Sequence, residues 1–205
     1  MRDLRRPIAA AAAALFIGGG ATVGAAVAAL PHPWTGGYVS EAGVSGFARS
    51  GAYHAGIWMV SAGLLLIALS LQATKAITAL LVTAGALGFV SGSVSCSTGC
   101  PLPPYETTTW ADLVHGGASI LAVALVALAM LIATVHATAH ATVETTGPAW
   151  PARFAFAVTA ATLAALTFCL LAIGRSTATA VLERIALLLV LAWLVDYAVR
   201  AAATR

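Results

Sequence analysis

The chain repeatedly carries apolar stretches of about 20 residues, and this feature constrains its fold more than any other. At a rise of about 1.5 Å per residue, such a stretch crosses a hydrocarbon core of about 30 Å as an α-helix. Only 8% of the 205 residues are charged and 60% are hydrophobic, whereas soluble domains carry about 25% charged residues. The sequence therefore predicts a membrane protein built from spanning helices.

Six stretches predict an all-α polytopic transmembrane bundle that forms a single membrane domain over residues 1–205. The predicted helices cover residues 8–30, 53–72, 76–94, 110–135, 153–173 and 181–199. A cleaved signal peptide is the alternative interpretation of the first stretch, because basic residues precede it and small residues end it. The stretch is longer than a usual signal core, which favours a retained helix.

Basic residues predict the orientation, because cytoplasmic loops are enriched in Lys and Arg. One side of the membrane receives seven of them and the other receives three, which are Arg49, Arg175 and Arg184. The prediction is a multi-pass protein of the cell inner (plasma) membrane with both termini in the cytoplasm. The cations are scattered and form no patch, so nucleic acid is not an expected partner.

The predicted outer side also collects ionisable side chains from three segments of the chain. They are Glu41, Arg49, His54, Asp112, His115, Glu183 and Arg184. Ionisable groups near a membrane boundary usually face the bundle interior or a wet cavity, which predicts a shared pocket open to the outside. A lattice of structural salt bridges is the alternative.

Two pairs in this set suggest particular chemistry. Asp112 and His115 are three positions apart on one helix face, so the carboxylate can orient the imidazole or merely anchor the helix end. Glu183 suits the positive end of the last helix dipole, whereas Arg184 opposes it. Arg184 is therefore expected to have a carboxylate or an anionic ligand as its partner.

Cys96 and Cys100 lie in the second outer loop, where a turn at Gly99 and an oxidising exterior favour a structural disulfide. Redox catalysis is the alternative for this pair. Cys169 is interpreted as a small buried apolar residue. His136 and His140 are four residues apart, and we interpret them as polar residues of the interface, so no metal site is predicted. No cofactor motif occurs.

Several short segments resemble one family. They are the first-loop run Trp34 to Gly43, the cysteine pair ahead of Asp112 and His115, and Glu183-Arg184-Ile185 followed by Trp193. On these segments the chain resembles the bacterial six-helix membrane proteins grouped as domain of unknown function 998 (DUF998), which are distantly similar to the Frag1/DRAM/Sfk1 proteins. The resemblance implies the six-helix architecture and adds weight to the outer polar residues. It implies no activity.

The leading hypothesis is a protein that binds a lipid headgroup or another amphiphile in the outer pocket. Arg49 and Arg184 would meet an anionic group, while Glu41, Asp112 and His115 would form hydrogen bonds. The expected partners are membrane lipids and further copies of the chain in a homo-oligomer.

Two other function classes stay open. A lipid hydrolase or acyltransferase would use His115 as general base and Asp112 to orient it, with Glu183 or Glu41 as a second acid. A small transporter is the third hypothesis. Ionisable residues are nearly absent from the middle of the predicted spans, which argues against it.

Overall fold

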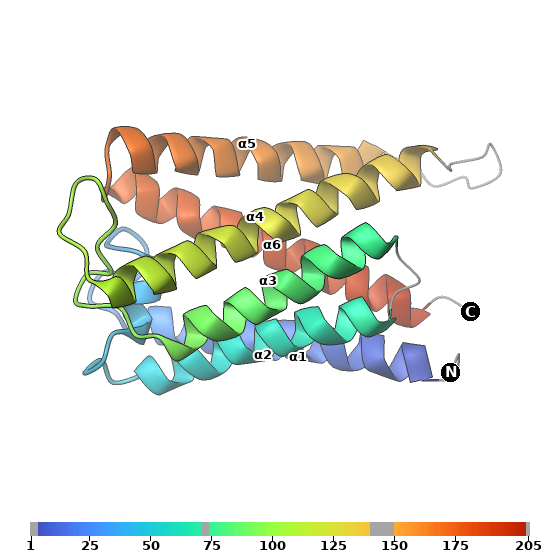
Figure 1. Ribbon diagram of the computed structural model, residues 1–205, viewed down its shortest axis with the longest axis horizontal. Helices are drawn as coiled ribbons and strands as arrows, with labels where there is room; N and C mark the ends of the chain where they lie inside the picture. The colour runs from blue at the N-terminus through green and yellow to red at the C-terminus, as the bar shows by residue number, and fades with distance from the viewer. Residues whose placement is uncertain (1–3, 71–73, 140–149, 204–205) are drawn as a thin grey trace.

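The computed structural model describes residues 4–70, 74–139 and 150–203, and it is all-α in these parts (Figure 1). Six helices account for most of them, and a short 3-10 helix, η2, covers Val39–Gly43. The six are α1 (Arg5–Val27), α2 (Ser50–Ser70), α3 (Lys75–Ser93), α4 (Trp110–Ala139), α5 (Trp150–Ala172) and α6 (Thr177–Ala203).

All six helices are long and apolar enough to cross a membrane, which confirms the predicted fold class. The observed helix ends differ from the predicted ones by at most four residues, as where α6 extends over 177–203 instead of 181–199. Apolar composition marks only the part of a helix that lies in hydrocarbon. The backbone hydrogen bonds of α4 and α6 continue past the apolar stretch, so these two helices end four residues later than predicted. Helices α1, α2, α3 and α5 instead end one to three residues earlier than predicted.

The helices run along the long axis of the molecule, and α1 begins at the same end at which α6 ends (Figure 1). The connecting segments 28–49, 94–109 and 173–176 gather at the opposite end, which we call the loop end. The structure thus confirms that three connections share one side. Which side faces the cytoplasm stays a prediction.

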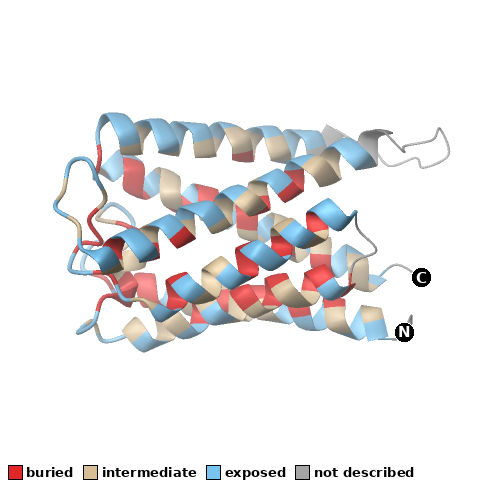
Figure 2. Cartoon of the chain, in the orientation of Figure 1, coloured by how far each residue is buried: buried red, intermediate tan, exposed pale blue. Residues whose placement is uncertain are grey.

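The main core lies between α1, α2, α3, α4 and α6. Its largest fully buried apolar side chains include Phe16, Ile67 and Leu81. Helix α5 packs against α6 and α4 at the side of the bundle and is largely exposed along its length (Figure 2). Its outward side chains include Phe154 and Phe168, which suit contact with lipid tails.

Helices α1 and α2 approach each other backbone to backbone. A Cβ atom added at Gly19 would lie 2.7 Å from the carbonyl oxygen of Gly56, and one added at Gly56 would lie 2.8 Å from that of Gly19. Small residues at a crossing allow close packing, which drives helix association in a membrane where hydrophobic burial adds little. This crossing places the start of α2, and with it His54, beside the loop end.

Candidate functional site

The loop end is a folded cap, and Arg175 lies at its centre. The Arg175 guanidinium forms an ion pair with Glu41 of η2, and its Nη1 lies 3.8 Å from an Oε1 of Glu106 in the second loop. It also lies 5.8 Å from the centre of the Tyr38 ring. One cation from the shortest loop therefore connects the other two loops.

Sequence reasoning did not predict this role for Arg175 or Glu106. Arg175 contributes only to the charge bias that predicts the orientation, and the sequence assigns no site role to Glu106. The sequence did contain a signal for this ion pair, because Arg175 is a lone cation in a short loop and the two other loops on the same predicted side each carry an acid. The pattern did not show which acid would reach it.

The turn that precedes η2 requires glycine at position 37. Gly37 has φ +57°, a conformation that favours glycine. A Cβ atom there would also collide with the Glu41 carboxylate, which accepts a hydrogen bond of 3.0 Å from the Tyr38 backbone N–H. Close packing of this turn therefore positions Glu41 for its ion pair with Arg175.

Arg184 is buried and binds the first loop through backbone carbonyl groups. Its guanidinium donates to the carbonyl oxygens of Pro33, Gly36, Gly37 and Ala180 over 2.8 to 3.2 Å. A guanidinium has five N–H donors, so four are used. Partial negative charges on carbonyls here take the place of the carboxylate or anionic ligand expected from the sequence.

Glu183 and Arg49 also contact the backbone of the first loop and of α1. Glu183 accepts a hydrogen bond of 2.9 Å from the Val39 N–H, and Arg49 donates one of 3.0 Å to the Ala25 carbonyl. The structure thus gathers Glu41, Glu183 and Arg184 around residues 33–43. In this arrangement they shape the loop.

Asp112 caps the start of α4 and is 2% exposed. Its carboxylate accepts hydrogen bonds from the backbone N–H and hydroxyl groups of Ser97 and Thr109, at 2.7 to 3.0 Å. The Asp112 N–H in turn donates to the Thr109 hydroxyl at 3.2 Å. This reciprocal arrangement is a capping box, and it also ties the second loop to the helix.

His115 is also 2% exposed, and it is directed to α3. Its Nδ1 lies 2.9 Å from the carbonyl oxygens of both Ser91 and Val94. Two acceptors at one nitrogen require that this nitrogen carries the proton. The Nε2 atom is buried and has no hydrogen-bond partner among the described residues. Backbone carbonyls therefore orient the imidazole, a role that the sequence had suggested for Asp112.

The structure brings the sulfur atoms of Cys96 and Cys100 together, with their Cα atoms 5.1 Å apart. This separation lies within the range for a disulfide. Both side chains are buried against Tyr38 and Val44. His54, the remaining predicted site residue, contacts backbone carbonyls of η2 and α3.

Burial and the nearby charges of Glu106 and Glu183 raise the pKa of Tyr38 to about 12, although the Arg175 guanidinium opposes this shift. Tyr38 therefore stays a neutral phenol at physiological pH. Its ring packs with Cys96 and Cys100, and the Arg175 guanidinium lies over the ring.

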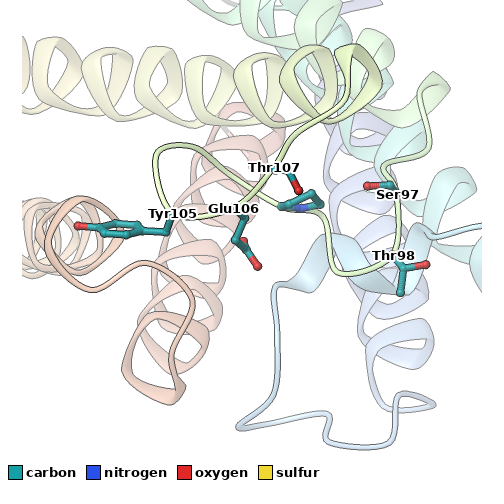
Figure 3. Close-up of a pocket in the computed structure, with 6 residues that line it drawn as sticks. Ser97, Thr98, Tyr105, Glu106 and Thr107 are labelled. Atoms are coloured by element: carbon teal, nitrogen blue, oxygen red, sulfur yellow. The ribbon is translucent and has the colours of Figure 1, made fainter.

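A pocket of about 700 Å³ opens at the loop end (Figure 3). It is lined by Ser97, Thr98, Pro101, Tyr105, Glu106 and Thr107. Figure 3 shows Glu106 and Thr107 across from Ser97 and Thr98, with the Tyr105 ring directed away toward α5, where its hydroxyl donates to the Leu171 carbonyl. Hydroxyl groups and one carboxylate thus face an open space.

The described residues contain no group of three or more His, Cys, Asp or Glu side chains placed to hold a metal ion. His136 belongs to them, whereas His140 lies outside the described residues.

No protein-family model matches the sequence, and no curated protein or solved structure matches it. The chain is a six-helix membrane protein by composition and fold. The resemblance to DUF998 stays a prediction.

Proposed function

We propose that this chain is a membrane-embedded binding protein that holds the polar headgroup of a lipid or another amphiphile at its loop end. The observation that carries the proposal is the open pocket between Ser97 and Glu106. It lies where the apolar helices end, which is the depth at which headgroups meet the hydrocarbon core. An amphiphile could thus place its polar part in the pocket and its tail beside the bundle.

The pocket lining favours a headgroup rich in hydrogen-bond donors. The Glu106 carboxylate accepts a hydrogen bond of 3.3 Å from the Leu102 N–H and has further lone pairs for a ligand. The hydroxyls of Thr98 and Thr107 both donate and accept, whereas the Ser97 hydroxyl donates to Asp112 and offers a ligand only lone pairs. The positive charge of Arg175 is offset by Glu41 and Glu106. An ammonium group or a sugar therefore fits better than a phosphate alone. This moves the proposed ligand contacts away from Arg184, whose donors bind the first loop.

Native mass spectrometry of protein purified with its membrane lipids tests this proposal. We expect Glu106→Gln to lose bound lipid, because an amide neither carries the negative charge nor accepts as strongly. Asp196→Asn is the matched control. It makes the same carboxyl-to-amide change near the C-terminal end of α6, which lies at the opposite end of the bundle from the pocket. Equal lipid retention by the wild type and both variants would refute the proposal.

One observation favours the enzymatic alternative, namely the Nε2 lone pair of His115, to which no described residue forms a hydrogen bond. A histidine whose Nδ1 proton is bound to a carbonyl presents Nε2 as a base. The side chain is however buried and does not line the described pocket. Turnover of a lipid ester that disappears in His115→Ala would establish this class. Ion-coupled uptake into proteoliposomes would establish transport.

A further inference from the structure

His54 joins three segments of the cap through its imidazole ring. It lies in the first turns of α2 (Ser50–Ser70). Its Nδ1 is 2.8 Å from the carbonyl oxygen of Gly92 on α3, and its Nε2 is 2.9 Å from that of Gly43 on η2. The Ser95 hydroxyl also lies 3.2 Å from Nε2.

The two carbonyl contacts determine how many protons the ring must carry. A carbonyl oxygen only accepts hydrogen bonds, and a neutral imidazole has a single N–H. Both contacts are hydrogen bonds at the same time only if both nitrogens are protonated. Gly92 belongs to the last turn of α3, where the helix dipole favours a cation. The observed geometry therefore matches an imidazolium.

The Ser95 hydroxyl is a different partner for Nε2 of His54 when the imidazolium loses one proton. If Nδ1 keeps its proton for Gly92, the neutral ring has an acceptor lone pair at Nε2. The Gly43 carbonyl cannot donate to this lone pair, whereas the Ser95 hydroxyl can. The three residues thus allow two hydrogen-bond arrangements that differ by one proton.

No described ion pair involves the His54 ring, so no carboxylate contacts the imidazole directly. Tyr53, the titratable neighbour on α2, meets it edge-on with centroids 5.5 Å apart. The contacts from α3, η2 and the second loop are Gly92, Gly43 and Ser95, none of which titrates. Glu41, on the same short helix as Gly43, is paired with Arg175.

We propose that His54 is a proton-dependent switch. When doubly protonated, its ring holds η2 against α2 and α3 through the Gly43 carbonyl. When neutral, the ring releases Gly43 and accepts a hydrogen bond from the Ser95 hydroxyl instead. The release of Gly43 removes the hydrogen bond between His54 of α2 and the first loop. Since η2 carries Glu41, the release loosens the segment that contacts Arg175 at the centre of the cap. The switch does not depend on what the pocket binds.

The first test reads the protonation state of the ring. Protein labelled with ¹⁵N-histidine is studied by NMR in lipid nanodiscs between pH 5 and 8, the range in which histidines generally change charge. His54→Gln identifies the signals. We expect both ring nitrogens to be protonated at the acidic end and only Nδ1 at the basic end. An Nε2 that is unprotonated at pH 5 would overturn the proposal.

The second test reads the release of the loop by hydrogen exchange. Protection factors of residues 38–47, corrected for the intrinsic pH dependence of exchange, should fall roughly tenfold as pH rises, which corresponds to one charge-assisted hydrogen bond. His54→Gln should remove this pH dependence, and His32→Gln in the same loop should keep it. An identical pH dependence in the wild type and His54→Gln would refute the switch.

Discussion

Arg184 shows at the residue scale how one side chain can hold a distant loop. Three of its four carbonyl partners lie 147 to 151 positions earlier in the chain. A guanidinium spreads its donors over a planar fork, whereas an ammonium is a point charge. The arrangement therefore needs arginine, and a positive charge alone does not replace it.

We expect Arg184→Lys to destabilise the protein by about 2–4 kcal/mol, because it leaves buried carbonyl oxygens without donors. Thermal unfolding in detergent measures the effect. Arg200→Lys is the matched control on the same helix, since Arg200 is exposed and pairs only with Asp196 in the described contacts. Equal melting temperatures for the two variants would contradict the assigned role.

The raised pKa of Tyr38 makes stability depend on alkaline pH. The pKa is about 12 in the folded protein and near 10.0 when the phenol is free. The folded state therefore binds more protons between these values, so stability falls as pH rises from 10 to 12 and is unaffected below. We expect the melting temperature to fall less steeply in Tyr38→Phe over this window. Parallel curves would show that Tyr38 does not contribute.

At the scale of elements, the contact between α1 and α2 depends on the absence of a side chain at one point. We expect Gly19→Ala to destabilise the bundle by about 1–3 kcal/mol, because the added methyl group meets the Gly56 backbone. Gly24→Ala on the same helix is the control, as a Cβ atom there has nothing within 4 Å. Thermal unfolding of both variants distinguishes packing from helix propensity. Similar effects would contradict the close approach.

The second loop is the other element whose structure can be tested directly. If Cys96 and Cys100 form a disulfide, a thiol reagent should label one cysteine per denatured chain, Cys169, and all three cysteines after reduction. Mass spectrometry counts the labels. Both paired sulfurs are buried, so we also expect reduction of the folded protein to be slow. Three labels without reduction would exclude the bond.

At the scale of the whole molecule, the orientation in the membrane is the main open prediction. The bias of seven basic residues to three places the loop end outside and the C-terminus in the cytoplasm. In a bacterial host, a C-terminal fluorescent protein should then fluoresce and a C-terminal alkaline phosphatase should be inactive. The reverse pattern would invert the topology and place the pocket on the cytoplasmic side.

The sequence by itself determined the number of helices, their approximate ends and the grouping of three loops at one end. These properties are local, since the length and hydrophobicity of one stretch decide whether it can span a bilayer. The same reasoning gathered Glu41, Asp112 and Glu183 at one end of the bundle.

Only the tertiary structure decided what these side chains touch. The partners of Arg184, His54 and His115 are mostly backbone carbonyls, which every residue carries, so no pattern of side chains reveals them. The ion pair between Arg175 and Glu41 depends on how the loops fold over the helix ends. Membrane insertion follows from composition, whereas the site follows from the packing of loops that are distant in the chain.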